Sequence, residues 1–224
     1  MIAQIPQALQ PREKMLRWGV AALSDAELLA ILLGTGAHQR NVLQLAQDLI
    51  ETHNGLGNLL RSPPCELEVN PGLGGAAKRC RIHAVLELAR RACADSLNRR
   101  NVMNSPELVF QHLQLNLGHL PHEVFAIMFL DAQHHLIELN EMFRGTLTQT
   151  SVYPREVVKR ALDLSASAVI LAHNHPSGHV QPSRADLNLT HALKSALKLI
   201  DVAILDHCIV SPGQSYSMAQ EGVL

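Results

Sequence analysis

Three residues in the C-terminal half of the chain have the types and the spacing of metal ligands. His173 and His175 are two residues apart, directly after an apolar run that ends at Ala172, and Asp186 follows eleven residues later. Residues i and i+2 of an extended segment point to the same side, so both imidazoles can reach one ion. Two nitrogens and one oxygen leave the fourth position of a tetrahedral site open, as in catalytic zinc sites. The sequence therefore predicts one zinc ion per chain.

The histidine pair alone is a weak signal, because the chain contains 13 histidines and such a pair is often simply exposed to solvent. The residues that follow strengthen the interpretation, since they shape a tight loop and supply a hydroxyl: Pro176, Ser177, Gly178, Pro182 and Ser183. We expect His134, His135 and His179 to face solvent. His207 follows an apolar run and Asp206, and it is left open as a hydrogen-bond partner of a ligand.

A hydrolytic zinc site also needs a base to accept a proton from the metal-bound water, whose pKa the ion lowers to about 7. Glu123 stands directly before the apolar run 124–130, at what would be the end of a strand. A strand beside the histidine strand could aim this carboxylate at the water. Glu138, Glu141 and Glu156 are rival candidates, and Glu123 could also be an ordinary exposed carboxylate.

Ser183 lies three residues before Asp186 and has two candidate roles. Its hydroxyl can donate a hydrogen bond to a developing oxyanion. Serine before a helix also commonly caps that helix. The two roles are compatible, and capping is the more conservative expectation.

The second half of the sequence has the pattern of alternating strands and helices. The ranges 124–130 and 168–172 are apolar runs of strand length, and 136–143 is a plausible partner strand. The ranges 154–165 and 183–199 are expected to be helices. This pattern predicts an α/β domain.

The first half, by contrast, has helical signals only. Ser24 and Glu27 can form a capping box at the start of a helix over 24–33, and the apolar residues of 41–53 recur at helical spacing. A third helix is expected over 76–97. Residues 98–106 are polar and contain a proline, so we place a boundary there, with domains at 1–98 and 102–224 and an α+β chain overall.

Composition sets broad limits. The chain has 224 residues, 47% hydrophobic and 17% charged, which predicts a globular protein. The four cysteines show no CxxC spacing and are expected to be reduced. No signal peptide or membrane-spanning stretch is evident, so we expect a soluble, cytoplasmic protein without membrane contact. Residues 1–100 hold 12 Lys and Arg against 9 Asp and Glu, a weak indication of nucleic-acid contact in this half.

One segment of the first half resembles the hairpin of a helix-hairpin-helix motif. Residues 70–74 join two helical stretches, and Gly72 and Gly74 permit a sharp turn before backbone amides that can bind phosphate. Lys78 and Arg79 follow at once, so we expect a contact with the DNA backbone that reads no sequence. Further cations follow at Arg81, Arg90 and Arg91. The alternative is a plain helix connection with a solvated charged face.

Taken together, Glu123, His173, His175, Ser183 and Asp186 resemble the JAMM motif of JAB1/MPN-type zinc metallopeptidases. The chain is similar above all to bacterial RadC proteins, the UPF0758 family. The segments that carry this resemblance are PREKML (11–16), LSDAELLAILLGTG (23–36), PGLGGAAK (71–78), FRGTLTQTSVYPREVVKRAL (143–162), AHNHPSGHVQPSRAD (172–186) and LDHCIV (205–210).

The resemblance implies a cytidine-deaminase-like MPN fold for 102–224, with His173, His175 and Asp186 as zinc ligands. It also implies that Glu123 is the general base and Ser183 the oxyanion donor. JAMM relatives cleave peptide or isopeptide bonds, whereas RadC proteins carry a DNA repair label that the motif does not supply.

Two hypotheses from different classes follow. The first is a zinc-dependent metalloprotease or isopeptidase acting on a peptide or protein. The second is a non-catalytic, DNA-associated accessory protein with a structural zinc. A nucleobase deaminase is disfavoured, because that chemistry uses HxE followed by PCxxC and this chain has HNH without CxxC. A nuclease fits less well, since paired-metal carboxylate clusters are more usual there.

Overall fold

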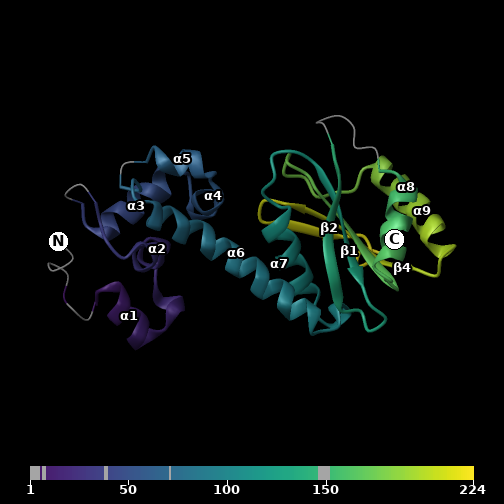
Figure 1. Ribbon diagram of the computed structural model, residues 1–224, viewed down its shortest axis with the longest axis horizontal. Coiled ribbons are helices and arrows are strands. Elements are labelled where there is room, and N and C mark those ends of the chain that lie inside the picture. The colour runs from purple at the N-terminus through teal and green to yellow at the C-terminus, as the bar shows by residue number, and fades with distance from the viewer. Residues whose placement is uncertain (1–5, 7–8, 38–39, 71, 146–151) are drawn as a thin grey trace. The chain divides into compact units, whose positions relative to one another are not determined.

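The computed structural model describes residues 6, 9–37, 40–70, 72–145 and 152–224 (Figure 1). The chain is α+β, as predicted, with a helical N-terminal region followed by a mixed sheet. It forms two compact units, Met1–Ala89 and Arg90–Leu224, and the division falls inside helix α6 (Ala76–Asn98). We call them the N-terminal unit and the C-terminal unit and describe each by itself.

The N-terminal unit is built from short helices packed around leucine side chains. These helices are α1 (Pro11–Trp18), the 3-10 helix η3 (Val20–Ala22), α2 (Asp25–Leu33), α3 (Val42–Thr52), α4 (Leu56–Arg61), α5 (Pro64–Glu68) and the first part of α6. Every helix from α2 to α6 contributes to one buried cluster, which includes Leu29, Leu33, Leu45, Leu49, Leu59, Leu67 and Ile82.

The predicted helices of this unit begin where their capping residues stand. Ser24 caps α2 and forms a capping box with Glu27, and Asn41 caps α3 in the same way with Gln44. In each box both side chains satisfy backbone amides that lack a partner within the helix. Gly34 then ends α2 with a φ of 77°, a conformation that glycine adopts without steric cost.

The C-terminal unit contains a five-stranded sheet in the order β2-β1-β3-β4-β5. The strands are β1 (Val124–Leu130), β2 (Leu136–Arg144), β3 (Ala168–Asn174), β4 (Ala203–Ser211) and β5 (Gln214–Ser217). Strand β1 is antiparallel to both β2 and β3, β3 is parallel to β4, and β4 is antiparallel to β5.

Helices cover both faces of this sheet. Helix α7 (Pro106–Asn116), which follows the 3-10 helix η4 (Val102–Asn104), lies on one face, and α8 (Pro154–Asp163) and α9 (Arg184–Lys198) lie on the other (Figure 1). Because both faces are covered, β1 and β3 are buried along their whole length. This explains why both strands read as unbroken apolar runs in the sequence.

Strand β1 has the predicted bounds, and β3 extends two residues beyond the predicted run to include His173 and Asn174. Helix α7 and strands β4 and β5 were not predicted. Of the three histidines expected in solvent, His179 is exposed, whereas His134 and His135 are partly buried, and His135 Nδ1 lies 3.1 Å from Asp131 Oδ2. Among the described residues, no helix combines the length and apolar character needed to cross a bilayer.

Candidate metal centre

The register of two neighbouring strands brings the candidate residues together. Phe125 of β1 is paired with His173 of β3 in the antiparallel ladder. Glu123 precedes Phe125 by two residues and His175 follows His173 by two, so both lie at the same end of this strand pair and on the same face. Helix α9 begins at this end and supplies Asp186.

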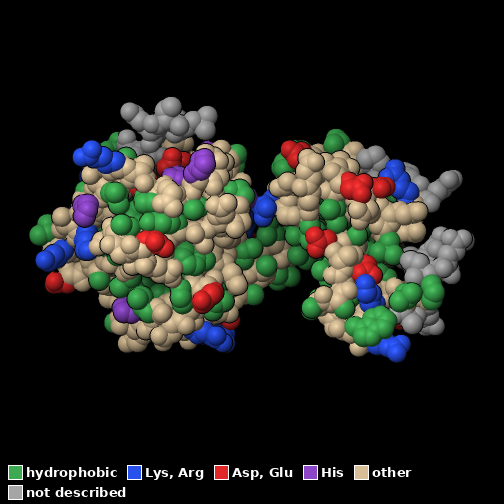
Figure 2. All heavy atoms as spheres, turned by 180° about the vertical axis from the view of Figure 1, so that it is seen from behind, with side chains coloured by type: hydrophobic (Ala, Val, Ile, Leu, Met, Phe, Trp, Pro, Cys, Tyr) green, Lys and Arg blue, Asp and Glu red, His purple; other side chains and the backbone are tan. Residues whose placement is uncertain are grey.

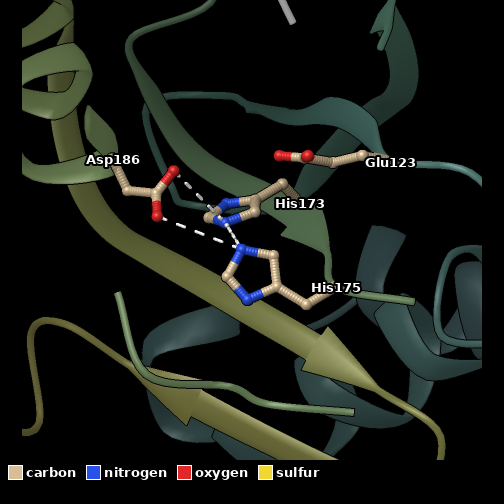
Figure 3. Close-up of side chains that lie close together, drawn as sticks. All are labelled: Glu123, His173, His175 and Asp186. Carbon is tan, nitrogen blue, oxygen red and sulfur yellow. Dashed lines mark hydrogen bonds and ion pairs between the residues drawn. The ribbon is translucent and has the colours of Figure 1, made fainter. Parts of the chain in front are cut away.

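Glu123, His173, His175 and Asp186 form what we call the four-residue cluster. One potential ligand atom from each lies within 4.8 Å of the others. The Nε2 atoms of His173 and His175 are 3.0 Å apart, and His173 Nε2 is 3.5 Å from Asp186 Oδ1. Figure 3 shows the Glu123 side chain reaching over His173 toward the Asp186 carboxylate. The structure thus brings together the three predicted ligands and the predicted base.

The start of α9 orients the Asp186 carboxylate. Asp186 Oδ2 accepts a hydrogen bond of 2.7 Å from the backbone amide of Ser183, and Ser183 Oγ accepts one of 3.2 Å from the amide of Asp186. This capping box holds Oδ2 and leaves Oδ1 nearest to His173. Burial acts to raise the pKa of Asp186, but His173 and the bonds from Ser183 outweigh it and hold that pKa below its ordinary value.

The orientation of His175 is fixed by its other ring nitrogen. His175 Nδ1 lies 2.7 Å from the carbonyl oxygen of His179, and the amide of His175 donates to the carbonyl of Val210 on β4. A carbonyl oxygen only accepts hydrogen bonds, so Nδ1 carries the proton and Nε2 of the neutral ring keeps its lone pair. That lone pair faces the cluster, as metal ligation requires.

His173 is contacted from behind by His207, the histidine that the sequence left open. His173 Nδ1 lies 2.8 Å from His207 Nε2, and both side chains are buried. Burial lowers the pKa of His173 to about 4 and that of His207 to about 3. Both rings are therefore neutral near pH 7.

Glu123 is half-buried beside the three predicted ligands. Burial raises its pKa, the nearby Asp186 adds to this, and His175 offsets part of it. The three rival carboxylates pair with arginines elsewhere: Glu138 with Arg160 at 2.6 Å, Glu141 with Arg144 at 3.1 Å, and Glu156 with Arg155 at 3.2 Å. Among the described residues, Glu123 is the glutamate that joins the cluster.

Asn174 lies between the two histidines in sequence and was not singled out from it. The side chain is buried, and its Oδ1 accepts a 2.8 Å hydrogen bond from the amide of Val124. Its Nδ2 donates to the carbonyls of Leu120 and His122. Asn174 therefore ties β3 to the segment that carries Glu123. A buried amide in an apolar strand is the one signal that could have revealed it.

The donor set of the cluster fits a divalent ion such as zinc. It consists of two imidazole nitrogens and one carboxylate oxygen, the ligand types of catalytic zinc sites, with a second carboxylate beside them. His175 Nε2 presents a lone pair, and Asp186 Oδ1 is not used by the capping box. Ser183 lies at the edge of this group, and its hydroxyl keeps one proton to donate while it caps α9.

The cations of the hairpin are used within the N-terminal unit. Lys78 Nζ donates to the carbonyls of Gly36 and Gly72, and Arg79 donates to the carbonyl of Leu73. Burial lowers the pKa of Lys78, and Arg81 lowers it further. A phosphate would have to compete with these carbonyls for both side chains.

Two further observations bear on the hairpin. Gly72 has a φ of 105°, and a Cβ there would lie 2.6 Å from Leu45 Cδ1. The backbone conformation and the packing therefore already explain a glycine at this position, without any contact with DNA. On the face shown in Figure 2, Lys and Arg side chains are interspersed with Asp and Glu and do not form one basic surface. DNA contact through Gly72, Gly74, Lys78 and Arg79 stays a prediction.

Comparison with known proteins identifies the family of both halves of the chain. Residues 103–223 match the family model of the RadC-like JAB domain, and residues 2–80 match the UPF0758 N-terminal model. A UPF0758 protein of Variovorax paradoxus (strain S110) is 60% identical over 220 residues, which cover 98% of each chain. One of Polaromonas sp. (strain JS666 / ATCC BAA-500) is 56% identical over 224 residues, the whole of both chains.

The mixed sheet, the ligand cluster and the first of these matches define the C-terminal unit as a RadC-like JAB domain. With relatives of this identity over nearly the full length, the chain belongs to the UPF0758 family.

Proposed function

We propose that this protein is a zinc-dependent hydrolase of peptide or isopeptide bonds, with the four-residue cluster as its active site. One observation carries the proposal: three ligand side chains and a half-buried glutamate converge so that their ligand atoms lie within 4.8 Å of one another. Three protein ligands leave a coordination position for solvent, and catalytic zinc differs from structural zinc in this respect. Membership in a JAB-domain family supports the same assignment.

In this proposal His173, His175 and Asp186 hold the ion. When bound, zinc acts as a Lewis acid that polarises a carbonyl and lowers the pKa of water. Glu123 removes one proton from the attacking water, whose oxygen bonds to the carbonyl carbon. Glu123 then delivers that proton to the nitrogen as the C–N bond breaks. Its raised pKa suits a group that must first accept a proton and then donate it.

Ser183 is the proposed donor to the carbonyl oxygen as that oxygen gains negative charge. Its hydroxyl proton is free of the capping box, in which Ser183 Oγ is the acceptor. A donor fixed at a helix start needs little reorganisation during the reaction, which is the condition for effective electrostatic stabilisation.

The test compares metal content and hydrolysis in the full-length protein and its Glu123→Gln variant. We expect one zinc per chain in both, and hydrolysis of isopeptide-linked or linear peptide substrates reduced by about 10²- to 10⁴-fold in the variant. The matched control is Glu156→Gln, an exposed glutamate beside Arg155 that should retain full activity.

Two results would contradict the proposal. The first is a folded wild-type protein that binds no transition metal. The second is equal hydrolysis by wild type and Glu123→Gln. Stoichiometric zinc in a wild-type protein that hydrolyses no amide would instead favour a structural zinc in a DNA-associated accessory protein.

A further inference from the structure

A chain of hydrogen bonds runs behind the metal centre through buried side chains. His207 Nε2 lies 2.8 Å from His173 Nδ1, and His207 Nδ1 lies 2.6 Å from Thr190 Oγ1. Thr190 Oγ1 in turn lies 2.7 Å from the carbonyl oxygen of Asp186. All three side chains are at most 3% exposed. We call His173, His207 and Thr190 the histidine relay.

At its cluster end, the histidine relay contacts His175, the second predicted imidazole ligand. His173 Nε2 lies 3.0 Å from His175 Nε2. His175 Nδ1 donates to the carbonyl of His179, so Nε2 of the neutral His175 ring can only accept. A hydrogen bond between the two Nε2 atoms therefore requires the proton to be on His173.

Each neutral imidazole has one donor nitrogen and one acceptor nitrogen. The hydrogen bonds of the histidine relay can therefore run, from donor to acceptor, in only two directions. In the first, Thr190 donates to His207, His207 Nε2 donates to His173 Nδ1, and His173 Nε2 donates to His175. In the second, His173 Nδ1 donates to His207, His207 Nδ1 donates to Thr190, and Thr190 donates to the carbonyl of Asp186.

Only the second direction is compatible with a cation at the cluster. A metal ligand must offer a lone pair, and the first direction places a proton on His173 Nε2. The second direction leaves a lone pair on Nε2 of His173 and on Nε2 of His175. These two lone pairs face each other at 3.0 Å and repel, and a cation bound by both nitrogens removes this repulsion. Thr190 can serve both directions, because its hydroxyl lies within reach of His207 and of a carbonyl.

We propose that His207 and Thr190 are positioning residues that set the tautomer of His173, and that cation binding reverses the direction of the histidine relay. This inference rests on the metal site of the proposed function. Each ring and the hydroxyl carry one proton before and after, but the reversal is not closed within the relay. The Nε2 proton of His173 leaves to water at the cluster as the cation binds, the proton of His207 Nε2 passes to His173 Nδ1, that of Thr190 passes to His207 Nδ1, and Thr190 takes a proton back from water. The relay thereby provides a neutral imidazole ligand with no net uptake or release of protons.

The surroundings hold the His207 ring in place. Asp206 Oδ1 accepts from the backbone amides of His207 and Ala219, and its Oδ2 accepts from Ser217 Oγ. Phe125 packs edge-on against the His207 ring, with centroids 5.7 Å apart. Because the His207 ring cannot turn over, only a move of its proton from one ring nitrogen to the other can match the tautomer that His173 needs when a cation is bound.

The first test is ¹⁵N NMR of the histidine ring nitrogens in the full-length protein, without metal and with zinc. We expect His207 to carry its proton on Nε2 without metal and on Nδ1 with zinc, while His175 keeps its proton on Nδ1 throughout. This readout does not depend on hydrolysis. A His207 that keeps one tautomer in both samples would overturn the inference.

The second test compares Thr190→Val with Thr190→Ser. Valine has nearly the shape of threonine but lacks the hydroxyl, so His207 Nδ1 loses its partner, whereas serine keeps it. We expect zinc affinity, measured by competition with a chelator, to fall about 10- to 100-fold in Thr190→Val and to be restored in Thr190→Ser. Equal affinities of the two variants would overturn the role of Thr190.

The failures of the two proposals are distinguishable. A wild-type protein that binds no zinc would refute the metal site and the relay reversal together. Zinc binding without a tautomer change would refute the relay alone. Zinc binding with the tautomer change but without hydrolysis would refute the proposed function and leave the relay intact. The NMR test needs only the wild-type chain, so it holds even if a Thr190 variant does not fold.

Discussion

Asn174 shows how a single side chain can organise a site that it does not face. His173 and His175 point to one side of the end of β3, and Asn174 points to the other, because side chains alternate along a strand. Its amide makes three hydrogen bonds to the backbone of residues 120–124. Glu123, the proposed base, lies within this short segment. The position of the proposed base thus depends on a buried amide on the opposite face of the sheet.

Replacement of Asn174 by alanine should therefore affect both stability and catalysis. The substitution leaves the amide of Val124 and two carbonyls without their partner, so we expect the free energy of unfolding to fall by about 2–4 kcal/mol. Urea unfolding measures this loss. Zinc affinity should fall less than hydrolysis, since the three ligands remain. The control is Asn188→Ala at an exposed position of α9, and a loss no larger than in this control would contradict the prediction.

At the scale of elements, the start of α9 serves the fold and the site with the same residues. Ser183 and Asp186 form the capping box that begins the helix. The same box orients the Asp186 carboxylate toward His173. Loss of the cap would therefore disturb a ligand, and an alanine variant of Ser183 could not separate capping from catalysis.

Ser183→Gly separates the two roles, because glycine at this cap position costs a helix on the order of a few tenths of a kcal/mol and has no side-chain donor. The backbone amide of residue 183 still donates to Asp186 Oδ2 in this variant, so the carboxylate keeps its orientation. We expect nearly unchanged thermal stability, unchanged zinc content, and hydrolysis reduced by about 10²- to 10³-fold, the usual loss for one oxyanion donor. Full activity in this variant would mean that Ser183 acts through its cap alone.

The elements that the sequence predicts have local signals. Capping boxes mark the starts of α2 and α3, and unbroken apolar runs mark β1 and the buried part of β3. Strand β4 lacks such a signal because Asp206 and His207 interrupt it. Their partners are Ser217 and Thr190, which lie 11 and 17 positions away. Buried polar residues in a strand are satisfied by distant partners, and local patterns do not reveal those.

The residues of the site likewise fall into those that local sequence patterns predict and those that depend on distant contacts. The three predicted ligands follow from residue type and spacing, whereas Glu123 was one of several candidate bases until the family resemblance selected it. Asn174 and Thr190 do not, because their roles depend on contacts with segments up to 54 positions away. Helix α7 was missed for a related reason. His112 occupies a buried position on its inner face, so the apolar periodicity of this helix is broken.

At the scale of the whole molecule, each unit has its own hydrophobic core. In the part of the chain that the structure describes, one buried cluster belongs to the N-terminal unit, and two clusters, one on each face of the sheet, belong to the C-terminal unit. The family models likewise match residues 2–80 and 103–223 separately. Leu97 near the end of α6 is buried in the sheet core, so that core includes residues before the matched JAB region.

The C-terminal unit also buries several histidines, which makes its stability sensitive to acid. Burial lowers the pKa of His112 to about 4, as it does for His173. Among the described residues, neither ring nitrogen of His112 has a hydrogen-bond partner. His112 lies on α7, across the sheet from the helices α8 and α9, so its contribution can be measured without altering the metal centre.

His112→Phe should reduce the acid sensitivity of the protein. In the unfolded chain His112 has its ordinary pKa of 6.5, so between pH 6.5 and about 4 the unfolded state binds a proton that the folded state does not. The free energy of unfolding therefore falls as the pH is lowered through this range, by up to about 3 kcal/mol for this one residue. Urea unfolding from about pH 7 to about pH 5 should show a smaller loss of unfolding free energy in the variant than in wild type.

The control is His191→Gln, at an exposed position of α9, which should retain the wild-type dependence of the unfolding free energy on pH. Equal slopes for all three proteins would show that His112 does not titrate with a depressed pKa, because His173 and His207 contribute equally to each.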